Sequence, residues 1–411
     1  MTTVFPSNTR ALLKHSPFSV ELNEFACWLG DERYTCGAAH RHLTQLDQAL
    51  PRIPQSACTE QDLHEAFAIA GQGVPSRPDR FRSTERVYGR FLAACGRLVL
   101  PKDDEPFAQV CAAYDRYLRD VRGLAASTRL FHVRAAADFL RRSPANRQGL
   151  YDLTPQNVEQ YVALRSREMS RASLQCVVGH LRGFLRYCHA HSHIAQELGA
   201  SIETPRIYRD EMPPQALDWS MVQALLRSIA LDSKAGRRDH CILHLMVHYG
   251  LRPSEVTSLR VDSIDWGASV LRVVQRKTRS DLLLPLMSQT MSILSSYLAH
   301  DRNTQGMSHP HLFLRVRCPC GPMGSAALGN IFEKRVRLAK LPIGGHHVYR
   351  LRHTFAMRLL TQGVGVKAIG DLLGHRSIDS TNVYLRLDID MLQGVALEVP
   401  SAASRQGDCH A

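Results

Sequence analysis

Two short apolar runs, residues 269–274 (SVLRVV) and 282–286 (LLLPL), stand out in this chain because they have the pattern of β-strands. The polar segment between them, residues 275–281, is typical of a β-hairpin turn. Over most of the remaining sequence, apolar residues recur three or four positions apart, which is the spacing of one face of a helix. The sequence therefore predicts a mainly α-helical fold with a small antiparallel β-sheet.

The chain divides into three blocks. Residues 101–106 (PKDDEP) are polar and bounded by proline, which is typical of a linker. Residues 1–103 are predicted to form a helical N-terminal extension of unknown role, in which one helix covers residues 85–100. Its expected core positions are Leu22, Phe25, Leu29, Leu43, Leu46 and Leu50. Residues 107–205 are predicted to form four or five helices, one of which begins at the N-cap Thr154 and at Pro155.

Residues 211–411 form the third block, which contains the hairpin and is otherwise predicted to be helical. Helices are expected over residues 218–230, 350–362, 366–373 and 380–386. Gly250 and Gly374 follow apolar helical patterns and are expected to be C-terminal caps, because glycine adopts the left-handed backbone conformation without steric cost.

Composition and charge restrict the class of protein. Of the 411 residues, 51 are Lys or Arg and 38 are Asp or Glu, which gives a formal net charge of +13 and favours a polyanionic partner, most often nucleic acid. An apolar content of 44% excludes a disordered or fibrous chain.

No stretch reaches the roughly 18 apolar residues of a membrane helix, and the N-terminus lacks a signal-peptide core. We therefore expect a cytoplasmic protein without a membrane partner. The 11 cysteines are expected to be reduced thiols.

A set of charged and polar residues in the third block indicates a reaction at a phosphodiester. Its members are Arg252, Lys277, Arg352, His375 and Tyr384. Arginine forks bind phosphate oxygens bidentately and stabilise a negatively charged transition state. A tyrosine hydroxyl can be a covalent nucleophile, and a lysine at a hairpin tip can donate a proton to the leaving oxygen. No carboxylate cluster suited to metal ions accompanies them, so we expect the positive side chains to take the place of metals.

The segments around these residues resemble the tyrosine recombinase family, which includes phage integrases and Xer-type resolvases. The resemblance covers about residues 107–389, and its boxes are residues 250–256 (GLRPSEV), 351–356 (LRHTFA), 372–375 (LLGH) and 381–384 (TNVY). The intervals of 23 positions from Arg352 to His375 and of nine from His375 to Tyr384 fit the family pattern. The resemblance implies a core-binding domain over residues 107–205 that closes a clamp on DNA with a catalytic domain.

The resemblance also implies how the reaction runs. Tyr384 would attack the scissile phosphate, form a 3′-phosphotyrosyl link and free a 5′-hydroxyl, whose oxygen Lys277 would protonate. The 5′-hydroxyl of another strand would then attack the link. Because the link keeps the bond energy, neither ATP nor a metal or other cofactor would be needed. The partners implied are double-stranded DNA and further recombinase subunits, which form homo- or hetero-tetramers on two duplexes.

The remaining roles concern phosphate binding. Arg252 and Arg352 would clamp the phosphate, His375 would hydrogen-bond one of its oxygens, and Glu255 would orient the site. Structural alternatives exist for several of these residues. Glu255 could simply form an ion pair with Arg252, and His375 could serve as a helix cap. Lys277 could be one of several solvated charges in its turn.

The chain departs from the family pattern at Tyr349. Family members usually carry His three residues before the second Arg, at the position most associated with proton transfer from the attacking Tyr. The unperturbed pKa of a tyrosine is about 10, so Tyr349 would be a poor base, although its hydroxyl could still bind phosphate. His346, His347 and His353 are candidates to replace the missing histidine.

These features favour a site-specific recombinase that integrates or excises a mobile element. Relaxation of DNA by a type IB topoisomerase-like enzyme is an alternative, because that class shares the chemistry. A DNA-binding accessory subunit with a degraded site is a second alternative, which Tyr349 supports. A zinc site at Cys318 and Cys320, near two histidines, is disfavoured because only one residue separates the cysteines.

Overall fold

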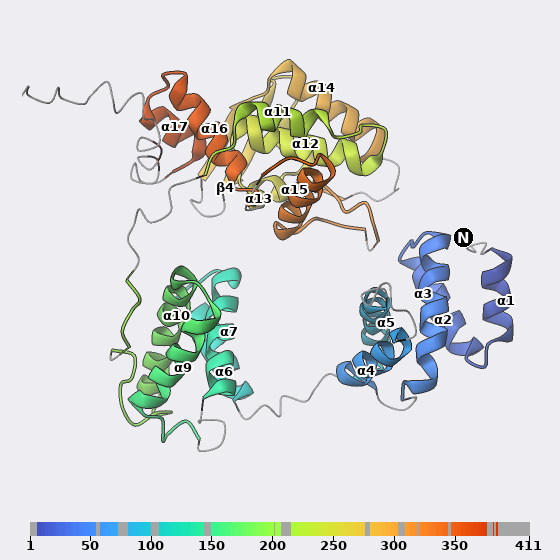
Figure 1. Ribbon diagram of the computed structural model, residues 1–411, viewed down its shortest axis with the longest axis vertical. Coiled ribbons are helices and arrows are strands. Elements are labelled where there is room, and N and C mark those ends of the chain that lie inside the picture. Colours follow the sequence, from blue (N-terminus) through green and yellow to red (C-terminus); the bar gives the residue numbers. More distant parts are fainter. Residues whose placement is uncertain are drawn as a thin grey trace, which may run out of the picture. The chain divides into compact units, whose positions relative to one another are not determined.

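Figure 1 shows a computed structural model of the chain. It describes residues 6–54, 58–72, 81–99, 107–143, 149–200, 202–206, 215–275, 280–302, 309–318, 320–343, 347–375, 381 and 384. Two compact units are present, one formed by most of residues 1–211 and the other by most of residues 212–411. Among the described residues, no helix is long and apolar enough to cross a membrane. The fold is mainly helical, with a small antiparallel sheet in the second unit, as the sequence predicts.

Residues 6–99 fold into helices around an apolar core. Their elements are α1 (Ser7–His15), α2 (Ser19–Asp31), α3 (Cys36–Ala49), the 3-10 helix η1 (Leu50–Arg52), β1 (Cys58–Thr59), α4 (Glu60–Gly71), α5 (Arg82–Ala94) and β2 (Leu98–Val99). All six core positions expected from the sequence are buried. Phe25 forms the centre of the core, with its ring 5.3 Å from the rings of both Tyr88 and Phe91.

The helix expected over residues 85–100 was wrong at its C-terminal end. Helix α5 stops at Ala94, and Gly96 follows with a φ of +67°, which turns the chain out of the helix. Strand β2 then pairs in parallel with β1. A pair of strands only two residues long has no periodicity, so the sequence pattern could not show it.

Residues 107–206 contain a second set of helices. Their described elements are α6 (Ala108–Asp120), α7 (Ala126–Arg142), α9 (Pro155–Glu168) and α10 (Arg171–Ala190). Helix α9 begins as predicted, because the Thr154 side chain accepts a hydrogen bond from the backbone of Asn157 and the Asn157 side chain accepts one in return. Tyr114, Phe139 and Phe184 are fully buried in the core that these helices share.

The second unit holds the sheet and a further set of helices. Its elements are α11 (Trp219–Arg227), α12 (Lys234–Tyr249), α13 (Pro253–Ser258), η3 (Val261–Ser263), β3 (Ile264–Asp265), β4 (Val270–Gln275), β5 (Ser280–Pro285), α14 (Ser288–Tyr297), the π-helix η4 (Leu298–Arg302), α15 (Ala326–Leu338), α16 (Arg350–Thr361) and α17 (Val366–Leu373). The antiparallel strand order is β3-β4-β5. Of the helix expected over residues 380–386, only Thr381 and Tyr384 lie within the described residues.

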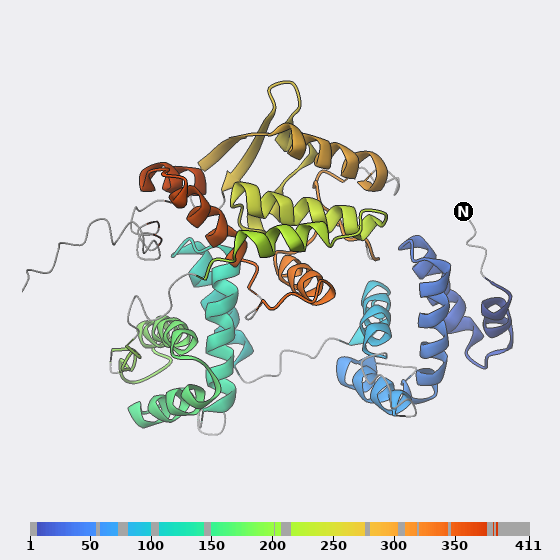
Figure 2. The same cartoon turned by 45° about the horizontal axis from the view of Figure 1, so that its top comes forward.

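The predicted hairpin is confirmed and lies at one edge of the unit (Figure 2). Leu271 pairs with Leu284 and Val273 with Leu282, which brings apolar side chains of both strands to the same face. Strand β3 was not expected, because two residues are too short to show an alternating pattern.

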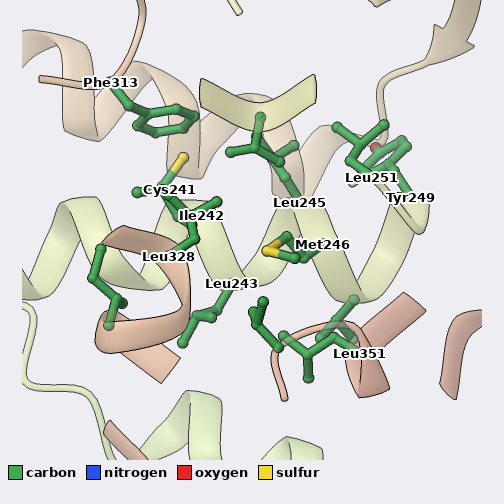
Figure 3. Packing of buried hydrophobic residues seen from close by; sticks show 14 of the residues in the cluster. Cys241, Ile242, Leu243, Leu245, Met246, Tyr249, Leu251, Phe313, Leu328 and Leu351 are labelled. Carbon is green, nitrogen blue, oxygen red and sulfur yellow. The ribbon is translucent and has the colours of Figure 1, made fainter. Parts of the chain in front are cut away.

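Helix α12 lies at the centre of the second unit and contacts α11, α14 and α16. Figure 3 shows its side chains Cys241 and Leu245 among residues from other elements, including Phe313 and Leu351. Because α12 is buried on nearly all sides, the position of its C-terminal end is set by the surrounding core. That end is Gly250, which has a left-handed φ of +62° and is the C-cap that the sequence predicts.

Replacing Gly250 with Ala is expected to destabilise the second unit by roughly 2–3 kcal/mol, through backbone strain and overpacking. A Cβ at this position would lie 2.5 Å from Cδ1 of Phe355 and 2.8 Å from Cδ2 of Leu373. Pulse proteolysis of the full chain in urea, scored on fragments of residues 212–411, measures the change. Gly363→Ala is the matched control, because Gly363 has a φ of +80° and a Cβ added there would have no other atom within 4 Å. Equal losses of stability in both variants would contradict a contribution from overpacking at Gly250.

A buried histidine in the same unit is expected to make stability depend on pH. His244 lies on α12 with its Nε2 2.9 Å from Oγ1 of Thr290, and burial lowers its pKa to about 3. Between pH 7 and pH 5 the unfolded chain protonates this residue while the folded chain does not. Stability is therefore lost as pH falls, by about 2 kcal/mol from this group. In His244→Gln the loss of stability between the two pH values should be smaller by about 2 kcal/mol. The other histidines with lowered pKa values still contribute to that loss, and the same proteolysis assay measures the change.

Candidate active site

Arg252 and Glu255 lie at the junction between α12 and α13. Gly250 ends the first helix and Pro253 occupies the first position of the second, where a proline loses no hydrogen bond. Glu255 is buried at the third helical position, where its Oε2 accepts from the backbone N of Arg252 at 2.8 Å. Its Oε1 accepts from Nη1 of Arg252 at 2.7 Å. One carboxylate therefore holds both the backbone and the guanidinium of Arg252.

Arg352 lies on α16 and is only 5% exposed. Its Nη1 donates to the carbonyl oxygen of Gly250 and its Nη2 to that of Leu373, each at 2.7 Å. These carbonyls belong to the C-terminal ends of α12 and α17, where helix dipoles favour a positive charge. Burial lowers the pKa of Arg352 to about 10, and the neighbouring Arg252 contributes in the same direction, so the guanidinium remains charged at neutral pH.

His375 directly follows Gly374, the predicted and observed C-cap of α17. Its Nε2 lies 3.1 Å from Nη2 of Arg352, and its Nδ1 lies 2.8 Å from Oγ1 of Thr381. Burial and the two nearby arginines lower the pKa of His375 to about 4, so the ring is neutral at pH 7. A guanidinium only donates, so Nε2 is the acceptor and we assign the proton to Nδ1.

Tyr384 packs against α16 and α17 with only 4% of its surface exposed. Its hydroxyl lies 2.9 Å from Nδ1 of His353, the residue that follows Arg352. Burial raises the pKa of the Tyr384 phenol, while the positive charges of Arg352 and Arg252 act to lower it. The structure thus brings Tyr384, both arginines and two histidines into one cluster.

Of the two remaining predicted site residues, the structure describes Tyr349 but not Lys277. Tyr349 is the residue before α16 and is 49% exposed. Lys277 lies outside the described residues, as does His346. The described strands on either side of Lys277 end with the pair Gln275 and Ser280.

Two further residues contact this site, although the sequence motifs gave them no role. Thr381 was quoted as part of a motif without a role, and its hydroxyl contacts His375. Gln275 is buried at the end of β4, where its side chain fills the space that a Cβ at Gly374 would need. The C-terminal end of β4 therefore packs directly against the turn that carries His375. The position of Thr381, three residues before Tyr384 in the same motif, was the signal that could have indicated its role. No local pattern in the sequence points to Gln275.

A protein metal site needs several ligand side chains in one place. The described residues include no cluster of three or more His, Cys, Asp or Glu side chains placed to hold a metal ion. The Sγ atoms of Cys318 and Cys320 lie 3.8 Å apart, and Cys318 has its pKa raised to about 11 by burial and by the neighbouring thiol. A thiol in this state is protonated at neutral pH.

Comparison with known proteins matches this unit to the phage integrase family over residues 215–390. A protein named as an integrase/recombinase, y4rA of Sinorhizobium fredii, is 30% identical over 399 residues, which cover 94% of this chain and 96% of y4rA. This chain belongs to the tyrosine recombinase family. Tyrosine recombinases break and rejoin DNA strands, and this chain is an enzyme of that class. Since the alignment with y4rA covers nearly the whole chain, the relationship extends into the N-terminal helices, beyond the residues that carry the motifs.

Further relatives agree with this assignment. The tyrosine recombinase XerC of Chromobacterium violaceum is 32% identical over 235 residues, covering 56% of this chain and 75% of XerC. Among solved structures, the Tn1549 transposon integrase in complex with a circular intermediate DNA has a TM-score of 0.54 at 17% identity, covering 68% of this chain and 98% of that one. A lambda integrase dimer bound to a COC′ core site has a TM-score of 0.52 at 17% identity, covering 66% and 93%. These structures show that the recombinase fold is shared.

Proposed function

We propose that this tyrosine recombinase cuts and rejoins double-stranded DNA at specific sites through a 3′-phosphotyrosyl link to Tyr384. The observation that carries the proposal is the cluster in which Arg352 contacts His375 and the charges of both arginines act on the phenol of Tyr384. Two guanidinium groups held by buried partners are preorganised for a phosphate, because they need no rearrangement when charge develops in the transition state.

Each residue of the cluster then has a defined role. Arg252 and Arg352 bind the non-bridging oxygens of the scissile phosphate while the Tyr384 oxygen attacks phosphorus. Lys277 protonates the 5′ oxygen as it leaves. His375, neutral and with its Nε2 accepting from Arg352, orients that guanidinium. Glu255 orients Arg252.

The biological substrate we propose is the end of a mobile element, which the enzyme integrates or excises. The integrase/recombinase name of y4rA and the transposon origin of the Tn1549 integrase support this role. Joining two duplexes requires four strand cleavages. With one nucleophile in each chain, this requirement favours four subunits, identical or mixed, on two DNA duplexes. Residues 107–205 would clamp the DNA together with residues 211–411.

A plasmid assay tests the proposal. A supercoiled plasmid with two direct repeats of the DNA that flanks the protein's own gene is incubated with the full chain. We expect two smaller circles with recombined junctions. Relaxed circles without new junctions would instead indicate a topoisomerase-like enzyme, and repeat-specific binding without either product would indicate an accessory subunit.

A further inference from the structure

Tyr384 is in direct contact with one histidine of α16. His353 follows Arg352 on α16, and its Nδ1 lies 2.9 Å from the hydroxyl oxygen of Tyr384. The two ring centres are 5.7 Å apart with the planes tilted by 53°, so the rings meet at their polar edges rather than stacking. A hydrogen bond of this length is the geometry in which a base removes a proton from a nucleophile.

Another base for Tyr384 would have to come from a nearby element. Tyr349 occupies the position where the family usually has a histidine, but its phenol is a poor proton acceptor at neutral pH. Half of its surface is exposed to solvent at the start of α16. His375 is committed on both nitrogens, to Arg352 and to Thr381. His353 is the described imidazole whose nitrogen faces the hydroxyl of Tyr384.

We infer that His353 is a further catalytic residue, which accepts the proton of Tyr384 as the tyrosine oxygen attacks phosphorus. The inference rests on the proposed function, because it requires Tyr384 to be the nucleophile. It assigns to the residue after the second arginine the task that Tyr349 cannot perform.

The Tyr384 O–H proton passes to the lone pair on Nδ1 of His353 while the bond from oxygen to phosphorus forms. The bond from phosphorus to the 5′ oxygen breaks with its electron pair on oxygen, which takes a proton from Lys277. In the rejoining step a 5′-hydroxyl attacks phosphorus and gives its proton to the neutral amine of Lys277. The Tyr384 oxygen leaves and takes its proton back from Nδ1 of His353.

The surroundings of His353 suit a neutral acceptor. Among the described residues, its charged and titratable neighbours are Arg352 on the same helix, His375 after α17, and Tyr384. Burial, and after it the charge of Arg352, lowers the pKa of His353, so the ring is neutral at pH 7. We assign its one proton to Nε2, which leaves Nδ1 to accept from the hydroxyl of Tyr384. A bound phosphate would offset the charge of Arg352 and make the imidazole a stronger base when DNA is in place.

The test measures the rate of adduct formation on a nicked suicide duplex that carries the DNA flanking the protein's own gene. The full chain is compared with His353→Asn and His353→Ala across a range of pH. Asparagine places an oxygen near the position of Nδ1, so it can accept a hydrogen bond but not a proton. We expect His353→Asn to slow adduct formation by about 100-fold and to lose the fall in rate that protonation of His353 causes in acid. Free imidazole should restore part of the rate in His353→Ala.

The control is His300→Asn, because His300 is exposed on η4 and its Nδ1 contacts the carbonyl oxygen of Ser296 at 2.9 Å. It should react at the wild-type rate, and all variants should bind the duplex equally in a mobility-shift assay. A wild-type rate in His353→Asn would overturn the inference while leaving a Tyr384-dependent adduct, and with it the proposed function, in place. A slow rate with an unchanged pH profile and no rescue by imidazole would make His353 a positioning residue only. Absence of any adduct in the wild type would overturn the proposed function and the inference together.

Discussion

Replacing Tyr384 with Phe is expected to abolish the denaturation-resistant protein–DNA adduct and to leave DNA binding unchanged. The substitution removes one oxygen, which is the atom that would form the bond to phosphorus. The ring remains and still fills its place beside α16 and α17. The lost hydrogen bond to His353 should cost only about 1 kcal/mol of stability. Trapping on a nicked duplex, followed by denaturing electrophoresis, measures the adduct.

A second buried tyrosine of the same unit provides the control for Tyr384→Phe. Tyr297 on α14 donates its hydroxyl proton to the carbonyl oxygen of Leu312 and lies outside the cluster of arginines and histidines. Tyr297→Phe should therefore form the adduct at the wild-type rate. An adduct that persists in Tyr384→Phe would assign the nucleophile to another residue.

The second large effect is expected at Arg352. Arg352→Ala should lower the rate of adduct formation by about 1,000-fold, because it removes a preorganised positive charge from the transition state. Arg352→Lys should recover little of this rate. A single ammonium group cannot reproduce the separate bonds that Nη1 and Nη2 make to Gly250 and Leu373 while also presenting a fork to phosphate.

Arg358 on the same helix is the matched control for Arg352. Its guanidinium lies 3.8 Å from the ring centre of Trp219, on a surface that the cluster around Tyr384 does not use. Arg358→Ala should lower the thermal stability slightly and leave the rate of adduct formation unchanged. Thermal unfolding of both variants separates loss of structure from loss of catalysis. Equal losses of rate in Arg352→Ala and Arg358→Ala would contradict a specific role for Arg352.

Local signals in the sequence determined several parts of the molecule. The periodicity of apolar residues predicted the helices and the core positions from Leu22 to Leu50. Two apolar runs joined by a polar turn over residues 269–286 predicted the hairpin, and the two glycines at positions 250 and 374 predicted helix ends. These features are set by neighbours a few positions apart, so a single stretch of sequence carries them. Short elements such as β1 and β3 escaped notice because two residues have no period.

The ordered motifs also determined the family, since their residue types and intervals agree with the family pattern at several places at once. Only the tertiary structure decided how those residues act on one another. It alone places the guanidinium of Arg352 on the C-terminal ends of α12 and α17, and Nδ1 of His353 on the hydroxyl of Tyr384. These partners lie between 21 and 102 positions apart in the chain. Contacts over such distances arise from the packing of α16 against other helices, which no local periodicity encodes.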